Sequence, residues 1–317
     1  MKPKTAHVIF PAIRASLLSI PQLSMPANRH PQLDPARQYE YPAHLRDMVA
    51  DMPCAAGVYV FHGEEGDLPL YIGKSINLRS RVLSHLRNPE EAHLLRQTRR
   101  ISHIRTAGEI GALLLEASLI KQQQPLLNKK LRSNRQLCSL RLVNGQPEVV
   151  YSKDVNFATE PALYGLFGSR HAAIEWLHQL ADQHRLCGGA LGLEKLKLGR
   201  ACFRATIKLC GGVCRGDESV EAHGQRLLIC LENLRVACWP YPGAIGLTER
   251  FEAAGGDDAL ADNSCQIHVI RNWCYLGSVS DLAKARELSR MAAGFDADGY
   301  KILCRPILSG SAHITLL

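Results

Sequence analysis

Two short apolar runs, GVYVF at 57–61 and LYIG at 70–73, stand on either side of the Gly- and acid-rich stretch HGEEGDLP. Apolar runs of this length joined by a turn-rich segment are typical of a β-hairpin. The apolar residues that follow recur at helical spacing, and they are Leu78, Val82, Leu83 and Leu86. Ser75 or Asn77 can cap that helix. This order of hairpin and helix constrains the fold more than any other part of the sequence.

The next segment adds one strand and one long helix. The stretch RISHIRT at 100–106 predicts a short strand. The spacing of Thr106 and Glu109 is that of a capping box, which opens the helix EIGALLLEASLIKQQQ before Pro125 ends it. The order strand, strand, helix, strand, helix predicts a compact unit that combines a small sheet with helices, within 39–135.

The rest of the chain predicts three further parts. Residues 1–38 contain repeated prolines and no sustained period, so we expect a loose extension. Within 136–216 the runs SLRLV and EVVYSKDV can pair as strands, and HAAIEWLHQLADQHRL predicts an amphipathic helix before a cysteine-rich region. Within 217–317 we expect a helix over SVEAHGQRLLICLENLRVACW and a single strand over QIHVIRNWCYLG.

The positive charge of the chain is concentrated in one segment. The whole chain carries a net charge of +8, whereas residues 71–135 hold thirteen Lys or Arg and four Glu. Such a concentration is typical of a surface that binds the phosphate backbone of a nucleic acid. A solvated basic surface is the alternative. The basic residues that we take as candidates for contact with DNA are Arg79, Arg87, Arg99, Arg100, Lys129, Lys130 and Arg132.

No part of the sequence predicts a membrane anchor or an export signal. The most apolar N-terminal stretch, AHVIFPAIRASLLSI, is interrupted by Pro11 and Arg14. With 46% hydrophobic and 21% charged residues, the composition is that of a globular protein. We therefore expect a cytoplasmic protein.

One carboxylate lies among apolar residues of the long helix. The neighbours of Glu116 one turn away are all apolar, and they are Ala112, Leu113, Leu119 and Ile120. An ionised carboxylate on such a face needs a cation, either an arginine in a buried salt bridge or a metal ion. Mg²⁺ suits a site with one protein carboxylate, because it keeps several of its waters. We assign Glu109 to the helix cap instead.

The stretch around LYIGK brings a phenol close to two cations. Tyr71 precedes Lys74 by three residues, and Arg81 lies on the following helix. Because nearby positive charge lowers the pKa of a phenol, we expect Tyr71 to accept a proton from water while Arg81 stabilises a phosphate. Packing in a strand is the alternative for Tyr71.

Together these residues resemble the GIY-YIG nuclease family, and more narrowly the N-terminal half of UvrC, a subunit of the bacterial nucleotide excision repair nuclease. The matching elements appear in family order and are Gly57-Val-Tyr59, Tyr71-Ile-Gly73-Lys74, Arg81, Glu116 within LLLEASLIK, and Asn128 after Pro125. The likeness extends from about Tyr41 to Cys214. It implies an α+β fold in which a small central antiparallel sheet is flanked by helices, followed by a UvrC-like Cys-rich module and a C-terminal α+β region of unknown role.

The resemblance also implies roles for these residues. Tyr71 would be the general base, assisted by Lys74, and Tyr59 would hydrogen-bond within the same cluster. Arg81 would contact the scissile phosphate, Glu116 would bind Mg²⁺ or Mn²⁺, and Asn128 would fix the site around the ion. His85 departs from the family, where tyrosine is usual, and we take it either as a catalytic residue or as an exposed helix residue.

By this resemblance the protein would be a metal-dependent DNA endonuclease. It would make only the 3′ incision in lesion-bearing double-stranded DNA presented by UvrA and UvrB, because no second nuclease motif follows residue 215. The alternatives are a structure-specific or homing endonuclease that acts without UvrB, and a DNA-binding module without catalytic activity.

Four of the eleven cysteines form a pattern with short spacings. Cys187, Cys202, Cys210 and Cys214 follow C-x14-C-x7-C-x3-C, and without an export signal a disulfide framework is not expected. Four thiolates can hold Zn²⁺ or an iron-sulfur cluster, but the paired C-x2-C motifs of structural zinc sites are missing. The resemblance to UvrC favours a [4Fe-4S] cluster, with zinc or no metal as alternatives.

Overall fold

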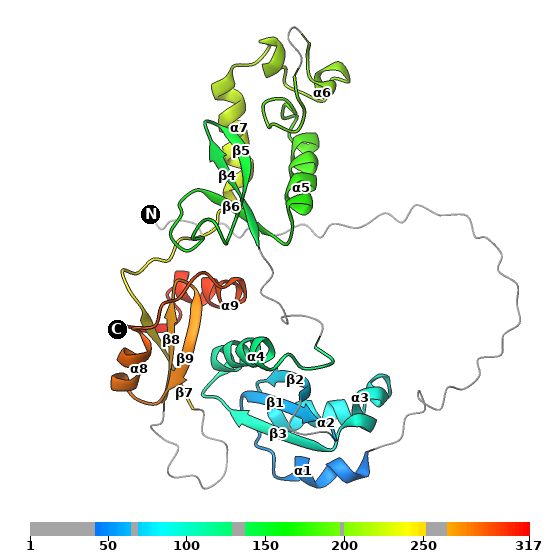
Figure 1. The fold of residues 1–317 in the computed structure, drawn as a ribbon, viewed down its shortest axis with the longest axis vertical. Helices are drawn as coiled ribbons and strands as arrows, with labels where there is room; N and C mark the ends of the chain where they lie inside the picture. Colours follow the sequence, from blue (N-terminus) through cyan, green and yellow to red (C-terminus); the bar gives the residue numbers. More distant parts are fainter. Residues whose placement is uncertain (1–41, 65–68, 129–136, 197–199, 252–264) are drawn as a thin grey trace, which may run out of the picture. The chain divides into compact units, whose positions relative to one another are not determined.

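The computed structural model describes residues 42–64, 69–128, 137–196, 200–251 and 265–317. These residues belong to one compact unit, Tyr39–Leu317, and carry three antiparallel sheets together with helices (Figure 1). The predicted α+β class is therefore confirmed. The predicted extension 1–38 lies outside the described residues.

The first sheet has the order β2-β1-β3, with β1 (Gly57–His62) in the centre between β2 (Pro69–Ser75) and β3 (Arg100–Arg105). The predicted hairpin is therefore correct, and Tyr59 stands opposite Gly73 in its register. Helix α2 (Leu78–Leu86) follows, capped by Asn77, whose Oδ1 accepts from Ser80 N at 3.0 Å. The short helices of this part that the sequence did not predict are η2 (Ala43–Leu45), α1 (Arg46–Ala50), η3 (Pro89–Glu91) and α3 (Ala92–Gln97).

Each face of this sheet packs on helices. Tyr59 and Phe61 lie in one hydrophobic cluster with residues of α1, α2 and α3. Because side chains alternate along a strand, Val58 and Val60 point to the opposite face, where they pack with Ile120 of α4 (Glu109–Gln123). Strand β2 therefore lies between the helix that carries Arg81, on one face of the sheet, and the helix that carries Glu116, on the other.

The start of α4 differs from the prediction. Gly108 is the N-cap residue and supplies no side-chain hydrogen bond, so the capping box of Thr106 and Glu109 does not form. Thr106 Oγ1 instead donates to the carbonyl of Gly108 at 2.9 Å. The end agrees with the prediction, because Gln124 adopts a left-handed conformation (φ 50°) directly before Pro125.

The second sheet, with the order β5-β4-β6, comprises β4 (Cys138–Val143), β5 (Gln146–Tyr151) and β6 (Leu163–Phe167). Helices α5 (Arg170–Gln183) and α7 (Val220–Glu232) pack on it through Leu177, Leu227 and Leu231 (Figure 1). The helix predicted to run to Trp239 therefore ends at Glu232. Between α5 and α7 lie α6 (Phe203–Thr206) and the 3-10 turn η4 (Val213–Arg215).

The third sheet lies in the C-terminal segment, which we define as the described residues within 245–316. Its order is β10-β7-β8-β9, and its elements are β7 (Ile245–Arg250), β8 (Cys265–Arg271), β9 (Cys274–Val279), α8 (Leu282–Leu288), α9 (Ala297–Leu308) and β10 (His313–Leu316). The single strand predicted over 266–277 is wrong, because the chain turns at Asn272 and Trp273, both with positive φ (54° and 64°). Two consecutive residues with positive φ form the turn of a β-hairpin. Positive φ is unfavourable for a tryptophan, and the burial of Trp273 in the core offsets this backbone strain. Within the described part of the chain, every helix is too short or too polar to cross a lipid bilayer.

Candidate active site

The candidate site is built on the β1–β2 hairpin. Tyr59 of β1 is fully buried, and its ring crosses over Gly73 of β2, where a Cβ atom would overlap the phenol. The glycine of the YIG motif is therefore required by this close approach. Tyr71, two residues earlier on β2, is half-buried, and the rings of Tyr59 and Tyr71 are 6.3 Å apart.

A buried hydrogen-bond chain lies behind these tyrosines. The hydroxyl of Tyr59 is 2.7 Å from Nε2 of His85, and Nδ1 of His85 contacts Oε2 of Glu91. Oε1 of Glu91 accepts a hydrogen bond of 3.1 Å from Asn88. Because a carboxylate only accepts, we assign the proton to Nδ1 of His85, which leaves Nε2 to accept from Tyr59. The phenolic oxygen of Tyr59 then remains free to accept from another donor.

His85 is buried, so its interpretation as an exposed helix residue is wrong. Its side chain is 4% exposed, and it packs against both Tyr59 and Tyr71. Burial lowers the pKa of His85, although the hydrogen bond to Glu91 opposes this. The imidazole is therefore held neutral at neutral pH.

Arg81 joins the cluster from α2. Arg81 is an exposed residue, and a hydrogen bond from its side chain to Tyr59 raises the pKa of Arg81. An exposed arginine that hydrogen-bonds a buried phenol suits a residue that meets an anionic substrate at the surface.

The expected lowering of the Tyr71 pKa is wrong for the protein alone. Burial raises the pKa of Tyr71 and the charge of Glu116 raises it further, and the opposing effect of Arg81 is smaller. Burial also raises the pKa of Tyr59, with a contribution from Tyr71. Both phenols are therefore protonated at neutral pH. The charge of Glu116 therefore acts on the phenol of Tyr71.

Glu116 projects from α4 towards β2. Its Oε1 accepts a hydrogen bond of 3.0 Å from the backbone amide of Lys74. Burial raises the pKa of Glu116, and this amide only partly offsets the effect. Among the described residues no arginine or lysine forms an ion pair with Glu116, so a buried salt bridge does not explain it. A half-buried carboxylate with one oxygen anchored by a backbone amide fits a divalent cation as its missing partner.

The assistance that Lys74 is predicted to give Tyr71 stays a prediction. Nζ of Lys74 donates to Oε1 of Glu109 at 2.6 Å, so the ammonium is directed along the surface. Glu109 is therefore the partner of Lys74 and not part of a helix cap. Burial raises the pKa of Glu116, and both the backbone amide and the charge of Lys74 act to lower it.

Asn128 lies beside the outer edge of β2, where the preceding residues Leu126 and Leu127 also hydrogen-bond to the strand. Its Oδ1 accepts from the amide of Ile72 at 2.9 Å, and its Nδ2 donates to the carbonyl of Ile72 at 2.9 Å. The side chain thus pairs with the edge strand as a neighbouring strand would. Since Ile72 separates Tyr71 from Gly73, Asn128 holds the backbone on which the site is built.

The candidate DNA-binding residues fall into two groups. Those within the described residues are all exposed, and they are Arg79, Arg87, Arg99 and Arg100. Arg99 lies 3.5 Å from Glu64 in an exposed ion pair. The others, Lys129, Lys130 and Arg132, lie outside the described residues.

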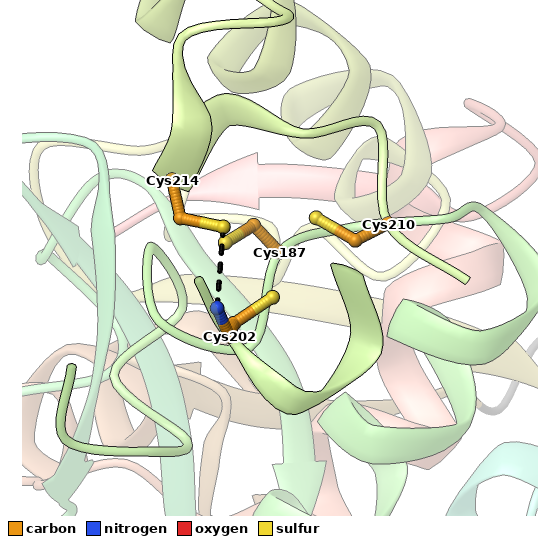
Figure 2. Close-up of side chains that lie close together, drawn as sticks. All are labelled: Cys187, Cys202, Cys210 and Cys214. Atoms are coloured by element: carbon orange, nitrogen blue, oxygen red, sulfur yellow. Dashed lines mark hydrogen bonds between the residues drawn. The ribbon is translucent and has the colours of Figure 1, made fainter. Parts of the chain in front are cut away.

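The four predicted cysteines converge (Figure 2). The sulfur atoms of Cys187, Cys202, Cys210 and Cys214 all lie within 4.8 Å of one another, and the first three residues are buried. Backbone amides point at three of these sulfurs: Ala205 N lies 3.3 Å from Cys202 Sγ, Gly212 N 3.2 Å from Cys210 Sγ, and Cys202 N 3.4 Å from Cys214 Sγ. Such donors stabilise thiolates, so the set fits a bound metal centre.

The spacing of the sulfurs bears on the kind of centre. In a tetrahedral site with Zn–S bonds near 2.3 Å, the sulfurs are about 3.8 Å apart. In a [4Fe-4S] cluster each cysteine binds a different iron, so the sulfurs must lie farther apart. The arrangement is therefore closer to that of a single ion, and a cluster requires the loops that carry Cys202, Cys210 and Cys214 to spread.

Sequence reasoning missed two residues that support these sites. Glu91 orients His85, and its only signal in the sequence is an acidic pair after the basic helix. His223 is 3% exposed on α7, and its Nε2 accepts from the amide of Cys187 at 3.0 Å. A histidine fixed on the backbone of a cysteine in the cluster has no signal in the spacing of the cysteines.

This fold and site define a UvrC-like GIY-YIG endonuclease. Family models match three parts of the chain: the UvrC-like GIY-YIG domain at residues 55–129, the UvrC/Cho excinuclease middle domain at 137–233 and the excinuclease Cho C-terminal domain at 244–317. Excinuclease Cho of Escherichia coli O157:H7 is 56% identical over 286 residues, which cover 90% of this chain and 94% of that protein. The chain therefore belongs to the excinuclease Cho family and is a DNA endonuclease of excision repair.

Two other similarities are more limited. The UvrABC system protein C of Caldicellulosiruptor saccharolyticus is 29% identical over 186 residues, which cover 56% of this chain and 31% of that protein. A crystal structure of the GIY-YIG N-terminal endonuclease domain of UvrC from Thermotoga maritima shows a protein that is 30% identical to the matched part of this chain. That domain is bound to its catalytic divalent cation, magnesium. The match covers 27% of this chain and 97% of that one, with a TM-score of 0.25.

Proposed function

We propose that the protein hydrolyses one phosphodiester bond on the 3′ side of a lesion, in double-stranded DNA presented by UvrA and UvrB, with one divalent cation held by Glu116. The observation that carries the proposal is the environment of this carboxylate: the Lys74 amide anchors it, its charge acts on Tyr71, and it has no ion-pair partner among the described residues. Because the substrate is chromosomal DNA, we place the protein in the cytoplasm.

The proposed cation supplies positive charge. Mg²⁺ or Mn²⁺ on Glu116, when bound, would neutralise negative charge on the scissile phosphate and on the carboxylate. Since the charge of Glu116 is one of the causes that raise the pKa of Tyr71, its neutralisation leaves Arg81 as the main charge acting on the phenol. Tyr71 then becomes more acidic and can release its proton to solvent, and the resulting phenolate accepts a proton from the attacking water.

The residues behind Tyr71 orient it. The proton of Tyr59 is directed to His85, so the oxygen of Tyr59 can accept from Tyr71 or Arg81. Arg81, at the surface, binds the phosphoryl oxygens that gain charge as water attacks. In this scheme His85 and Glu91 do not touch the substrate, and they act by fixing Tyr59.

The four cysteines are proposed to hold a metal centre that stabilises the Cys-rich part. The resemblance to UvrC supports a [4Fe-4S] cluster, and the spacing of the sulfurs supports zinc as the alternative. The centre has no role in the hydrolysis that we propose.

The test is cleavage of a duplex with one defined lesion and a label on the damaged strand, in Mg²⁺ or Mn²⁺, with and without UvrA and UvrB. We expect one cut 3′ to the lesion that depends on UvrB. Glu116→Gln should reduce cleavage by on the order of a thousandfold, because the cation contributes several kcal/mol to the transition state. Glu90→Gln, the same change at an exposed site nearby, should cleave as the wild type does.

Two results would overturn parts of this proposal. Full activity of Glu116→Gln would remove the proposed mechanism. Equal cutting without UvrB would replace the repair assignment by that of a structure-specific nuclease. Direct titration with Mn²⁺, followed by electron paramagnetic resonance, should in addition show binding to the wild type and weakened binding to Glu116→Gln.

A further inference from the structure

Helix α4 is buried on two faces, and only one of these faces packs on the first sheet, which carries Tyr59 and Tyr71. Glu109 and Glu116 point to the β2 side, whereas Ile110, Leu114 and Lys121 lie roughly 130° away around the helix. Leu114 is 2% exposed and belongs to a hydrophobic cluster of the C-terminal segment. The helix that carries Glu116 is therefore shared between two parts of the fold.

The first turn of α4 is capped by the C-terminal segment. Oε1 of Glu249 on β7 accepts from Ile110 N at 3.0 Å, and Oε2 accepts from Gly111 N at 2.7 Å. These amides have no acceptor within the helix, because the first turn of any helix leaves its donors unpaired. Glu249 thus takes the place of the missing capping box and meets the positive end of the helix dipole.

Glu249 is itself held in place by a second buried chain of hydrogen bonds. Nε2 of His268 is 2.9 Å from Oε2 of Glu249, and Nδ1 of His268 is 2.6 Å from Ser278 Oγ. Ser278 Oγ lies 2.6 Å from the hydroxyl of Tyr275. His268 is fully buried, so the carboxylate has one fixed position.

Two glycines of the sequence TAGEIG are explained by this contact. A Cβ at Gly108 would overlap the Glu249 carboxylate, and a Cβ at Gly111 would overlap the His268 ring. Gly111 lies inside a helix, where glycine costs about 1 kcal/mol relative to alanine. The close approach of the C-terminal segment gives a physical reason for that cost.

The last turns of α4 are held from the same side. Nζ of Lys121 is 2.6 Å from Oδ1 of Asp296 and 3.0 Å from Oδ2 of Asp298, at the start of α9. The C-terminal segment therefore contacts the helix at its first turn, at Leu114 and at Lys121. Contacts at both ends fix the rotation of a helix and its position along the axis.

We propose that the C-terminal segment is part of the nuclease machinery: Glu249, with His268 behind it, is a positioning residue that sets helix α4 and thereby the Glu116 carboxylate. This inference rests on the proposed role of Glu116. It assigns a role to the C-terminal segment, whose role the sequence left unknown. It also predicts that the affinity for the cation depends on Glu249, which does not itself contact the cation.

The experiment compares the full-length wild type with Glu249→Ala, Glu249→Gln and the control Glu287→Gln, which makes the same charge change at an exposed position of α8. Hydrogen-deuterium exchange of peptides covering Ile110 and Gly111 reports on the cap, and Mn²⁺ titration reports on the site. In Glu249→Ala we expect these amides to exchange at least about tenfold faster, because both lose their acceptor. We expect the Mn²⁺ concentration at half-saturation to rise several-fold.

Glu249→Gln keeps one acceptor oxygen and should give intermediate values for both measurements. If Glu249→Ala does not fold, this variant provides the test. Exchange and Mn²⁺ affinity equal to those of Glu287→Gln would overturn the proposal, and so would faster exchange without weaker binding. Failure of the proposed function gives a different result: Glu116→Gln then binds Mn²⁺ as the wild type does. In that case hydrogen-deuterium exchange of Glu249→Ala still reports whether Glu249 caps α4.

Discussion

The hydroxyl of Tyr59 lies 2.7 Å from Nε2 of His85, and both side chains are buried behind Tyr71. This pair connects the nuclease site to a buried histidine whose pKa is lowered by burial. Because burial lowers the pKa of His85 below its ordinary value of 6.5, protonation of His85 is easier in the unfolded chain than in the folded protein. The contribution of neutral His85 to the free energy of unfolding is therefore complete above pH 6.5 and is lost as the pH falls below that value.

Replacement of His85 by glutamine should therefore remove a pH-dependent part of the stability. Between about pH 7 and pH 5 the free energy of unfolding of the wild type should fall more steeply than that of His85→Gln. Urea unfolding at a series of pH values measures the difference. The control is His171→Gln, since His171 is exposed on α5. Parallel curves for wild type and His85→Gln would contradict the prediction.

Replacement of Tyr71 by phenylalanine tests the proposed base. The change removes the phenolic oxygen and keeps the ring, so we expect cleavage to fall by about 10²–10⁴-fold with little change in the free energy of unfolding. Single-turnover cleavage at saturating Mg²⁺ measures the effect. Tyr151→Phe, on β5 of the second sheet, should be as active as the wild type. A Tyr71→Phe variant with near-normal rate would mean that another group accepts the proton.

The parts of the site that could be predicted are those fixed by local patterns. The hairpin that places Tyr59 opposite Gly73 follows from two apolar runs, and the caps and spacing of α2 place Arg81 beside it. Glu116 was recognisable because a carboxylate among apolar residues on one helix face is unusual. In each of these cases the signal lies within a few residues of the group itself.

The parts that could not be predicted depend on contacts between distant segments. The cap of α4 comes from Glu249, which is 139 residues from Ile110 in the sequence, so a locally plausible capping box gave the wrong interpretation. The pKa of Tyr71 depends on burial and on the distance to Glu116, and neither follows from the proximity of Lys74 in the sequence. The near-continuous apolar character of α4 indicated burial but not that two different parts of the fold bury it.

Loss of one cysteine of the cluster should release its metal. We expect the anaerobically purified wild type to contain four iron and four sulfide ions per chain if the centre is a [4Fe-4S] cluster, and one zinc ion if the spacing of the sulfurs in Figure 2 is that of the bound state. Cys202→Ser should lose most of the metal, because Cys202 contributes one of the four ligands.

Cys54→Ser is the matched control, since Cys54 is exposed and lies outside the cluster. Metal and sulfide analysis of wild type and both variants decides between the two centres. Wild-type protein that contains neither iron nor zinc after anaerobic preparation would contradict both assignments.

The contact of Lys121 with Asp296 and Asp298 should contribute strongly to stability. Burial lowers the pKa of Lys121, but the hydrogen bonds to the two carboxylates outweigh it and the pKa is raised overall. Lys121→Met leaves both carboxylates in a largely buried place without a cation, so we expect the free energy of unfolding to fall by about 2–3 kcal/mol. Urea unfolding at pH 7 measures the loss.

Two further variants make this test specific to the buried charges. Lys284→Met removes the lysine of an exposed pair with Asp281 on α8, and its unfolding curve should be unchanged. The double variant Lys121→Met with Asp298→Asn should recover part of the stability, because one of the unpaired charges is gone. Additive losses in the double variant would mean that Lys121 stabilises the contact through the packing of its aliphatic chain and not through its charge.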